Sequence, residues 1–161
     1  MSGSGASGIA FSRDNVHFTT RGMDDTVKLF DIRNFKQPVA TANNFTSYYE
    51  ETNIIYSPDE KYILTGLSVK RDSTDGGRLM FLNRDTLKIE RDVPVGTGSV
   101  IRTIWNPRIN QIVCSSSDNG TYVLYDPKVS TRGAVMSVNK QVKVQKDDIY
   151  FGEYVLIFLI Q

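Results

Sequence analysis

The sequence predicts an all-β fold built from about three repeated four-stranded units. Short runs rich in Val, Ile, Thr, Tyr and Phe alternate with clusters of Asp, Asn, Gly and Pro, which is the alternation of strands and turns. No stretch of helical length carries apolar residues at the spacing of an amphipathic helix. A recurring motif then divides the strands into units.

The recurring motif is an aromatic residue followed directly by Ser or Asn near the start of each unit. Phe11, Tyr56 and Trp105 hold this position, and the successive spacings are 45 and 49 residues. Repeats of about 40–45 residues with four strands each are typical of β-propeller blades. A single blade cannot cover both of its apolar faces, so the units are expected to stack face to face as part of an incomplete propeller.

Twelve strands are predicted, each rich in β-branched or aromatic residues and bounded by a turn signal. In chain order they are Gly8–Phe11, Val16–Arg21, Val27–Ile32, Val39–Ala42, Thr52–Tyr56, Tyr62–Leu67, Leu79–Asn83, Lys88–Asp92, Val100–Trp105, Gln111–Ser115, Thr121–Asp126 and Gly133–Val138. Hairpin turns between the second and third strands are predicted at Asp24-Asp25, Asp75-Gly76 and Asn119-Gly120, because Asp, Asn and Gly tolerate positive φ. A polar insertion, Val69–Gly77, lengthens this hairpin in the second unit.

The units define the expected domain organisation. A flexible stub covers residues 1–7, three blades cover about 8–47, 48–95 and 96–140, and a tail of a different character covers 141–161. The tail contains Tyr154–Ile160, a run of high β propensity without Pro, and such a run favours aggregation. We therefore expect deletion of Asp147–Gln161 to improve solubility without loss of strand content.

Composition excludes several classes of function. The 161 residues carry 19 Lys and Arg against 18 Asp and Glu, and a net charge of +1 gives no basic footprint for nucleic acid or membranes. One cysteine, Cys114, cannot form an internal disulfide, which favours a reducing compartment. The longest apolar run is seven residues, far below the roughly 20 of a membrane helix, and no signal-peptide pattern opens the chain. The sequence predicts a soluble protein.

Catalytic and cofactor sites are not expected. A triad or a metal site needs more His and Cys than the single His17 and the single Cys114, which are interpreted as a strand residue and a packed thiol. The segment Gly3–Gly8 matches the G-x-G-x-x-G nucleotide motif, but no strand precedes it and β pattern follows. We interpret it as a loop and predict no enzyme, no metal and no cofactor.

Three third-strand segments resemble the corresponding strands of WD repeats, with Phe, Leu and Tyr in place of the usual Trp. They are Val27–Arg33, Arg78–Arg84 and Gly120–Asp126. In such repeats an Asp six residues before the aromatic belongs to a buried hydrogen-bond network. Asp24 holds that place before Phe30, whereas Asn119 and Gly76 hold it in the other units.

From Gly8 to Lys140 the sequence resembles the gastrulation-defective type of nuclear WD-repeat protein. The resemblance is carried by FDIRNFKQP, YSPDEKYILTG and WNPRINQIVCSSSDNG. The resemblance implies a nuclear protein whose whole propeller has about seven blades. The chain is then a fragment, a splice form or an incomplete gene product, and these alternatives stay open.

A partner-binding site is expected at Phe30, Asp31 and Arg33. In some WD-repeat proteins a W-D-x-R string docks the damage-binding adaptor of cullin ubiquitin ligases, and this chain has Phe for Trp. The resemblance implies an interaction scaffold that binds proteins, as a ligase substrate receptor in genome maintenance; a spliceosome-type RNA-processing component and a product without function are the alternatives. Arg33 could instead be a blade-edge residue without a partner. The variant Arg84→Ala is the expected control with little effect on binding, because Arg84 follows Leu82-Asn83 at a different spacing. No small-molecule substrate is expected.

Two loops have two interpretations each. The insertion residues Lys70–Asp75 and the segment Tyr48–Glu51 could contact partners. Mixed charge at a hairpin tip is usually only solvated, whereas Tyr48–Glu51 is equally consistent with a packed loop between blades.

Overall fold

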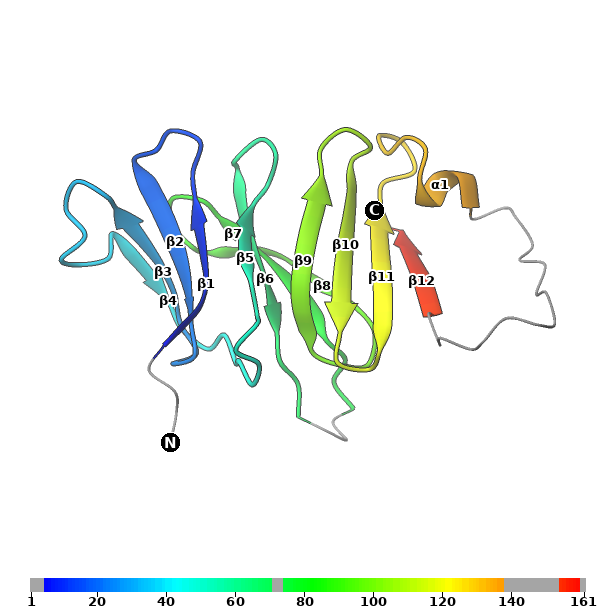
Figure 1. The fold of residues 1–161 in the computed structure, drawn as a ribbon, viewed down its shortest axis with the longest axis horizontal. Helices are drawn as coiled ribbons and strands as arrows, with labels where there is room; N and C mark the ends of the chain where they lie inside the picture. Colours follow the sequence, from blue (N-terminus) through cyan, green and yellow to red (C-terminus); the bar gives the residue numbers. More distant parts are fainter. Residues whose placement is uncertain (1–4, 71–73, 138–153, 160–161) are drawn as a thin grey trace.

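Three four-stranded β-sheets follow one another along the chain in the computed structural model, which describes residues 5–70, 74–137 and 154–159. The sheets stand side by side, and each is built from four strands that follow one another in chain order (Figure 1). The predicted all-β fold of three blades is confirmed. We call the sheets blade 1, blade 2 and blade 3 in chain order.

Neighbouring strands in each blade follow chain order; blades 1 and 2 are antiparallel meanders, and so are the first three strands of blade 3. Blade 1 contains β1 (Ala6–Phe11), β2 (His17–Gly22), β3 (Val27–Asp31) and β4 (Ala40–Ala42). Blade 2 contains β5 (Ile54–Tyr56), β6 (Tyr62–Leu67), β7 (Arg78–Asn83) and β8 (Ile89–Pro94). Blade 3 contains β9 (Val100–Asn106), β10 (Gln111–Ser116), β11 (Gly120–Tyr125) and β12 (Tyr154–Leu159).

The turns between second and third strands use the expected residue types. Asp25 has φ 60° between β2 and β3, and Asn119 has φ 64° between β10 and β11. Asp and Asn adopt this left-handed region more readily than other residues with a side chain, so the turn residues select these hairpins. In blade 2 the same connection carries the insertion, and its residues 71–73 lie outside the described part.

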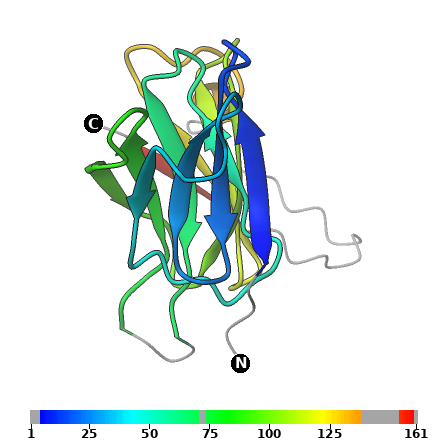
Figure 2. The ribbon, with the colours of Figure 1, turned by 90° about the vertical axis from the view of Figure 1, so that its left-hand side faces the viewer.

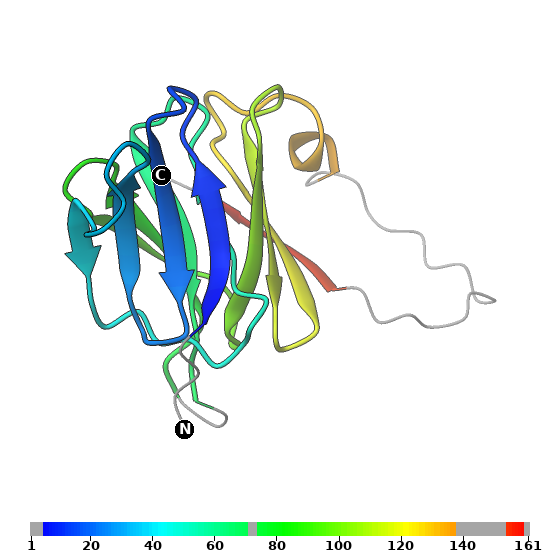
Figure 3. The same cartoon turned by 60° about the vertical axis from the view of Figure 1, so that its left-hand side comes forward.

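The predicted fourth strand of the third unit is wrong. Ala134–Ser137 forms a short helix, α1, directly after Gly133 with φ 51°. The fourth position is taken by β12, which pairs parallel to β11 from Gly120↔Tyr154 to Tyr125↔Leu159 (Figure 3). Ala and Met favour helix over strand, and the apolar run near the end of the chain has the higher β propensity. The tail therefore contributes a strand to the third blade.

Apolar side chains fill both seams between blades. Val27 and Leu29 of blade 1 pack with Ile63, Met80 and Leu82 of blade 2. A second cluster joins the opposite face of blade 2 to blade 3, and its members include Leu64, Leu79, Phe81, Ile112, Cys114 and Leu124. Each fully buried side chain of this size contributes roughly 1.5–3 kcal/mol. Stacking buries both faces of blade 2.

The first strands of the blades lie along one side of the array. The Asn53 side chain, just before β5, accepts the Thr103 N–H of β9 at 2.9 Å and donates to the Thr103 carbonyl at 2.8 Å. It thereby joins the start of blade 2 to the first strand of blade 3. At the equivalent place in blade 1, Gly8 lies against the backbone of residues 52–54, where an added Cβ would make tight contacts at 3.0–3.1 Å.

Deleting residues 154–161 is expected to remove strand signal, contrary to the expectation from the tail's composition. The deletion takes away the six residues of β12 and leaves the edge of β11 unpaired, which favours association between chains. Far-ultraviolet circular dichroism and amide exchange along β11 measure the effect. Deleting 160–161 alone is the control, and an unchanged spectrum with higher solubility for the 154–161 deletion would contradict the expectation.

Candidate protein-interaction site

Phe30, Asp31 and Arg33 lie at the end of β3 and in the turn that follows it. The ring of Phe30 stacks on Phe18, with centroids 5.0 Å apart and planes 9° apart, and Phe18 contacts Phe11 at 5.6 Å. These three rings are cross-strand neighbours in the register of β1, β2 and β3. Val27 and Leu29 on β3 pack against blade 2, so Phe30 and the other two rings make an aromatic ladder on the opposite face of blade 1. Blade 1 is the sheet in front in Figure 2.

Arg33 and Asp31 form a two-pronged ion pair. The Arg33 Nε donates to Asp31 Oδ1 at 2.9 Å and Nη2 donates to Oδ2 at 2.6 Å, while the Arg33 backbone N–H donates to Oδ1 at 2.9 Å. The Arg33 side chain is nevertheless 72% exposed. Its guanidinium therefore has a fixed orientation at the surface.

The pair keeps both groups charged. Hydrogen bonds from the Arg33 side chain and backbone lower the pKa of Asp31 to about 2, and Asp31 raises the pKa of Arg33. A guanidinium has five N–H groups, and the fork to Asp31 uses two of them. The outer edge can still donate to carbonyls or carboxylates of a partner. Exposed apolar side chains, Ile32 and Phe35, lie in the same turn region.

The strand register allows the first three strands of blade 1 to be aligned with those of blade 3 residue by residue, without an insertion or deletion. Phe11 pairs with Phe18 and Phe18 with Phe30, just as Trp105 pairs with Ile112 and Ile112 with Leu124. Every pair of equivalent positions is separated by 94 residues. Phe11 is 58% exposed, whereas Trp105 packs against the core between blades 2 and 3. The aromatic ladder thus occupies the position that a preceding blade covers in blades 2 and 3.

The same register makes Asp24 equivalent to Asp118. Asp24 is exposed, and it accepts the Thr26 hydroxyl at 2.6 Å and the Lys28 ammonium at 2.9 Å. These bonds remain within one turn and hold its pKa below the usual range, with the Thr26 bond as the largest cause. No contact of Asp24 with a connection between blades is present among the described residues. The predicted buried network around Asp24 stays a prediction.

Asp118 joins blade 3 to the connection from blade 2. Its carboxylate accepts the Gly98 and Thr97 N–H groups at 3.0 Å each, the Gly120 N–H at 2.9 Å and the Tyr122 hydroxyl at 2.6 Å. Burial raises its pKa, but the bonds from Tyr122, Gly120 and Gly98 outweigh this effect and hold the pKa well below its usual range. Sequence reasoning missed Asp118 because it counted back from Tyr125, while the register counts from Leu124.

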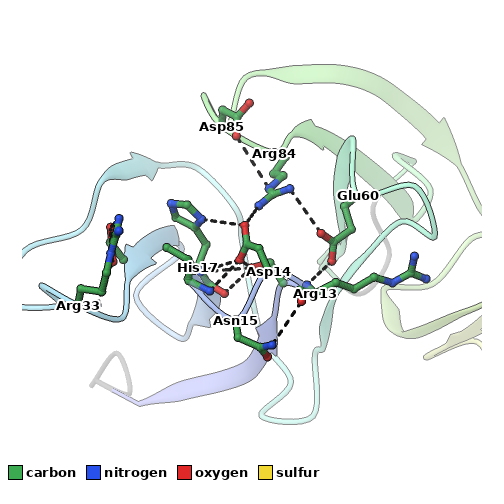
Figure 4. Close-up of polar contacts among 11 residues, drawn as sticks. Arg13, Asp14, Asn15, His17, Arg33, Glu60, Arg84 and Asp85 are labelled. Carbon is green, nitrogen blue, oxygen red and sulfur yellow. Dashed lines mark hydrogen bonds and ion pairs between the residues drawn. The ribbon is translucent and has the colours of Figure 1, made fainter.

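Arg84 connects blade 2 to blade 1 and is not an inert position. It follows β7, and its guanidinium bonds Asp14 in the turn between β1 and β2 and Glu60 in the turn between β5 and β6 (Figure 4). His17 Nδ1 lies 3.3 Å from the same Asp14 carboxylate. Hydrogen bonds, chiefly from the Ser12 hydroxyl, hold the pKa of Asp14 well below its usual range. Figure 4 shows Arg33 apart from this cluster.

Metal-binding side chains do not gather in the described part of the chain. Cys114 is fully buried, burial raises the pKa of its thiol to about 11, and its sulfur lies 3.6 Å from the Thr103 hydroxyl. No three His, Cys, Asp or Glu side chains of the described residues are placed to hold a metal ion. Within residues 5–70, 74–137 and 154–159, no helix has the length and hydropathy needed to cross a membrane.

The two candidate loops differ in what can be described. Tyr48 is 52% exposed, and its backbone N–H donates to the Ser68 hydroxyl at 3.0 Å. The Ser47 N–H beside it donates to the Asp25 carboxylate at 2.9 Å, so this connection is tied to both blades. The tip of the insertion, residues 71–73, lies outside the described residues, as do Gly3 and Ser4 of the glycine-rich motif.

Comparison with known proteins finds WD-repeat relatives along most of the chain. WD repeat-containing protein 70 of Xenopus tropicalis is 37% identical over 155 residues, which cover 96% of this chain and 25% of that protein. The human protein of the same name is 35% identical over 126 residues, or 78% of this chain and 19% of the relative. The Gastrulation defective protein 1 homolog of Drosophila melanogaster is 33% identical over 138 residues, or 86% and 21%.

These relatives confirm the resemblance that the third strands and the sequence from Gly8 to Lys140 predicted. The chain spans about a quarter of the length of the curated relatives that it matches. No protein-family model matches it.

Proposed function

The chain belongs, over the stretch that it shares with these relatives, to the WD-repeat proteins, and from that premise we propose that it is a rigid scaffold for binding other proteins. Stacked blades supply exposed turns on a firm framework, and binding residues are commonly found on such turns. The observation that carries the proposal is Arg33, which is exposed, held by Asp31 and bordered by Ile32 and Phe35.

The specific form of the proposal is a substrate receptor of a cullin ubiquitin ligase that acts in the nucleus in genome maintenance. Arg33 would dock the damage-binding adaptor of that ligase. The Asp-x-Arg spacing, the outward guanidinium edge and the neighbouring apolar side chains support this assignment, because arginine and apolar anchors dominate the energy of many interfaces. No catalytic role is proposed for the chain.

Replacing Arg33 by alanine is expected to weaken binding of the purified adaptor about thirtyfold, because truncating an arginine at the centre of an interface can cost about 2 kcal/mol. Isothermal titration calorimetry of the chain with the adaptor measures this. Arg33→Lys should also bind weakly, since an ammonium cannot reproduce the planar fork.

The matched control is Lys36→Ala, a basic residue in the same connection between β3 and β4. It should bind like the wild type. Arg84→Ala is unsuitable as a control, because Arg84 joins two blades. Equal affinity of folded wild type and Arg33→Ala would disprove the docking role, and capture of splicing factors without the adaptor would favour an RNA-processing role.

A further inference from the structure

A small cavity lies at the seam between blades 2 and 3. Its volume is about 190 Å³. Three aromatic side chains line it together with two apolar, one amide and two charged residues: Tyr62, Phe81, Trp105, Ile112, Leu124, Asn110, Arg91 and Asp126. Drug-sized pockets start at roughly 300 Å³, so this cavity suits a single side chain. Both walls belong to this chain, so no further blade is needed to form it.

The aromatic walls have a fixed, boxlike geometry. The Phe81 ring is nearly perpendicular to Tyr62, at 80° and 6.2 Å, and to Trp105, at 79° and 6.3 Å. Phe81 is buried, and the Trp105 indole N–H donates to Asn110 Oδ1 at 3.1 Å. Tyr62 and Trp105 are half-buried. The rings are therefore held in place before any ligand arrives, which reduces the entropic cost of binding.

The equivalent position at the other seam is filled by a cation of the chain itself. Register pairs Tyr62 with Asn83 and Gln111 with Tyr125, so the next residues, Arg84 and Asp126, are equivalent. Arg84 bonds Asp14 and Glu60 across the seam between blades 1 and 2. At the seam between blades 2 and 3 the chain supplies a carboxylate instead of a guanidinium.

The Asp126 carboxylate is oriented by its own turn. Its Oδ1 accepts the Lys128 N–H at 2.8 Å, and its backbone N–H donates to the Ser130 hydroxyl at 2.9 Å. Asp126 is half-buried and lines the same cavity as the three rings. A carboxylate beside aromatic faces attracts a positive charge, because the face of each ring is the negative part of its quadrupole.

We propose that this cavity binds the cationic side chain of an arginine or a lysine, methylated or not, from a partner protein. The cation lies against the rings of Tyr62, Phe81 and Trp105, and Asp126 neutralises its charge. Arg91, directly opposite Phe81 in the ladder of β7 and β8, is exposed, so its own charge is solvated. The Arg91 charge favours an acidic residue beside the bound cation in the partner's sequence. The site is independent of adaptor docking at Arg33.

Trp105 reports occupancy of the cavity, because it is the single tryptophan of the chain. Fluorescence titration compares blocked five-residue peptides that carry arginine, lysine, trimethyllysine or the neutral tert-butyl analogue of trimethyllysine at the centre. We expect at least one cationic peptide to bind about tenfold more tightly than the neutral analogue, since cation–π attraction requires the charge. Comparable binding by the neutral analogue, or no saturable change with any cationic peptide, would overturn the proposal.

A matched pair of variants tests the carboxylate. Asp126→Asn keeps an oxygen that can accept the Lys128 N–H but loses the charge, and it should bind the preferred cationic peptide about fivefold more weakly. Asp85→Asn removes a carboxylate from the turn after β7, outside the cavity, and should bind normally. Equal affinity of wild type and Asp126→Asn would also overturn the proposal.

Discussion

Replacing Asp118 by alanine is expected to lower the free energy of unfolding by about 3 kcal/mol, because hydrogen bonds to a charged group contribute about 1.5–3 kcal/mol each and several share this carboxylate. The N–H groups of Thr97 and Gly98 would lose their acceptor, and the connection between blades 2 and 3 would lose its attachment to the turn before β11. Urea unfolding followed by circular dichroism measures the loss.

The effect of Asp118 depends on pH in a definite direction. Its pKa is lowered in the folded chain, so its contribution is complete above the unfolded pKa near 3.9 and is lost as the pH falls toward the folded value. Wild type and Asp118→Ala should therefore converge in stability in acid. Asp24→Ala, at the equivalent but exposed position, should cost less than about 0.5 kcal/mol. Equal losses for the two variants would contradict this assignment.

Replacing Arg21 by alanine is expected to cost a similar amount, about 3 kcal/mol, since the change empties a buried site and removes hydrogen bonds from a charged donor to backbone carbonyls. Arg21 is fully buried, yet it donates to the carbonyls of Gly22 at 3.2 Å and Thr46 at 3.0 Å. Its guanidinium also lies 5.8 Å from the centre of the Phe45 ring. Arg21 therefore holds Phe45 and Thr46, which belong to the connection between blades 1 and 2, against blade 1.

Thermal unfolding of Arg21→Ala and of Arg21→Met separates the two contributions. Methionine fills most of the space but donates no hydrogen bond, so its loss reports the hydrogen bonds from the guanidinium to the Gly22 and Thr46 carbonyls. Burial lowers the pKa of Arg21 to about 10. This value is still well above neutral pH, so the side chain stays charged. A loss below about 0.5 kcal/mol for Arg21→Ala would show that water replaces the guanidinium at no cost.

Most strands were predictable from the sequence, because they are rich in apolar and β-branched residues and are bounded by clear turn residues. Tyr62–Leu67 matches its prediction fully, since dense apolar residues lie between a Pro-Asp turn and a polar insertion. The fourth strand of blade 3 was not predictable in this way. Its partner edge is β11, and the sequence does not show that a segment near residue 154 returns to that edge.

The candidate sites were predictable only where they depend on neighbouring residues. Asp31 and Arg33 are two residues apart, so their fork follows from local geometry. Arg84 meets Asp14 across 70 positions of the sequence, and the cavity at Trp105 gathers residues from two blades. Such contacts depend on register and stacking, which an unaligned sequence does not specify.

The parallel pairing of β12 with β11 has a consequence for the order of folding. Every other strand pair joins neighbours in a meander, so those hairpins close short loops. Residues 126–153 separate β11 from β12, and closing a longer loop costs more chain entropy before any contact repays it. The meanders can form while β12 is still unpaired, and the third blade is then completed late, from the far end of the chain.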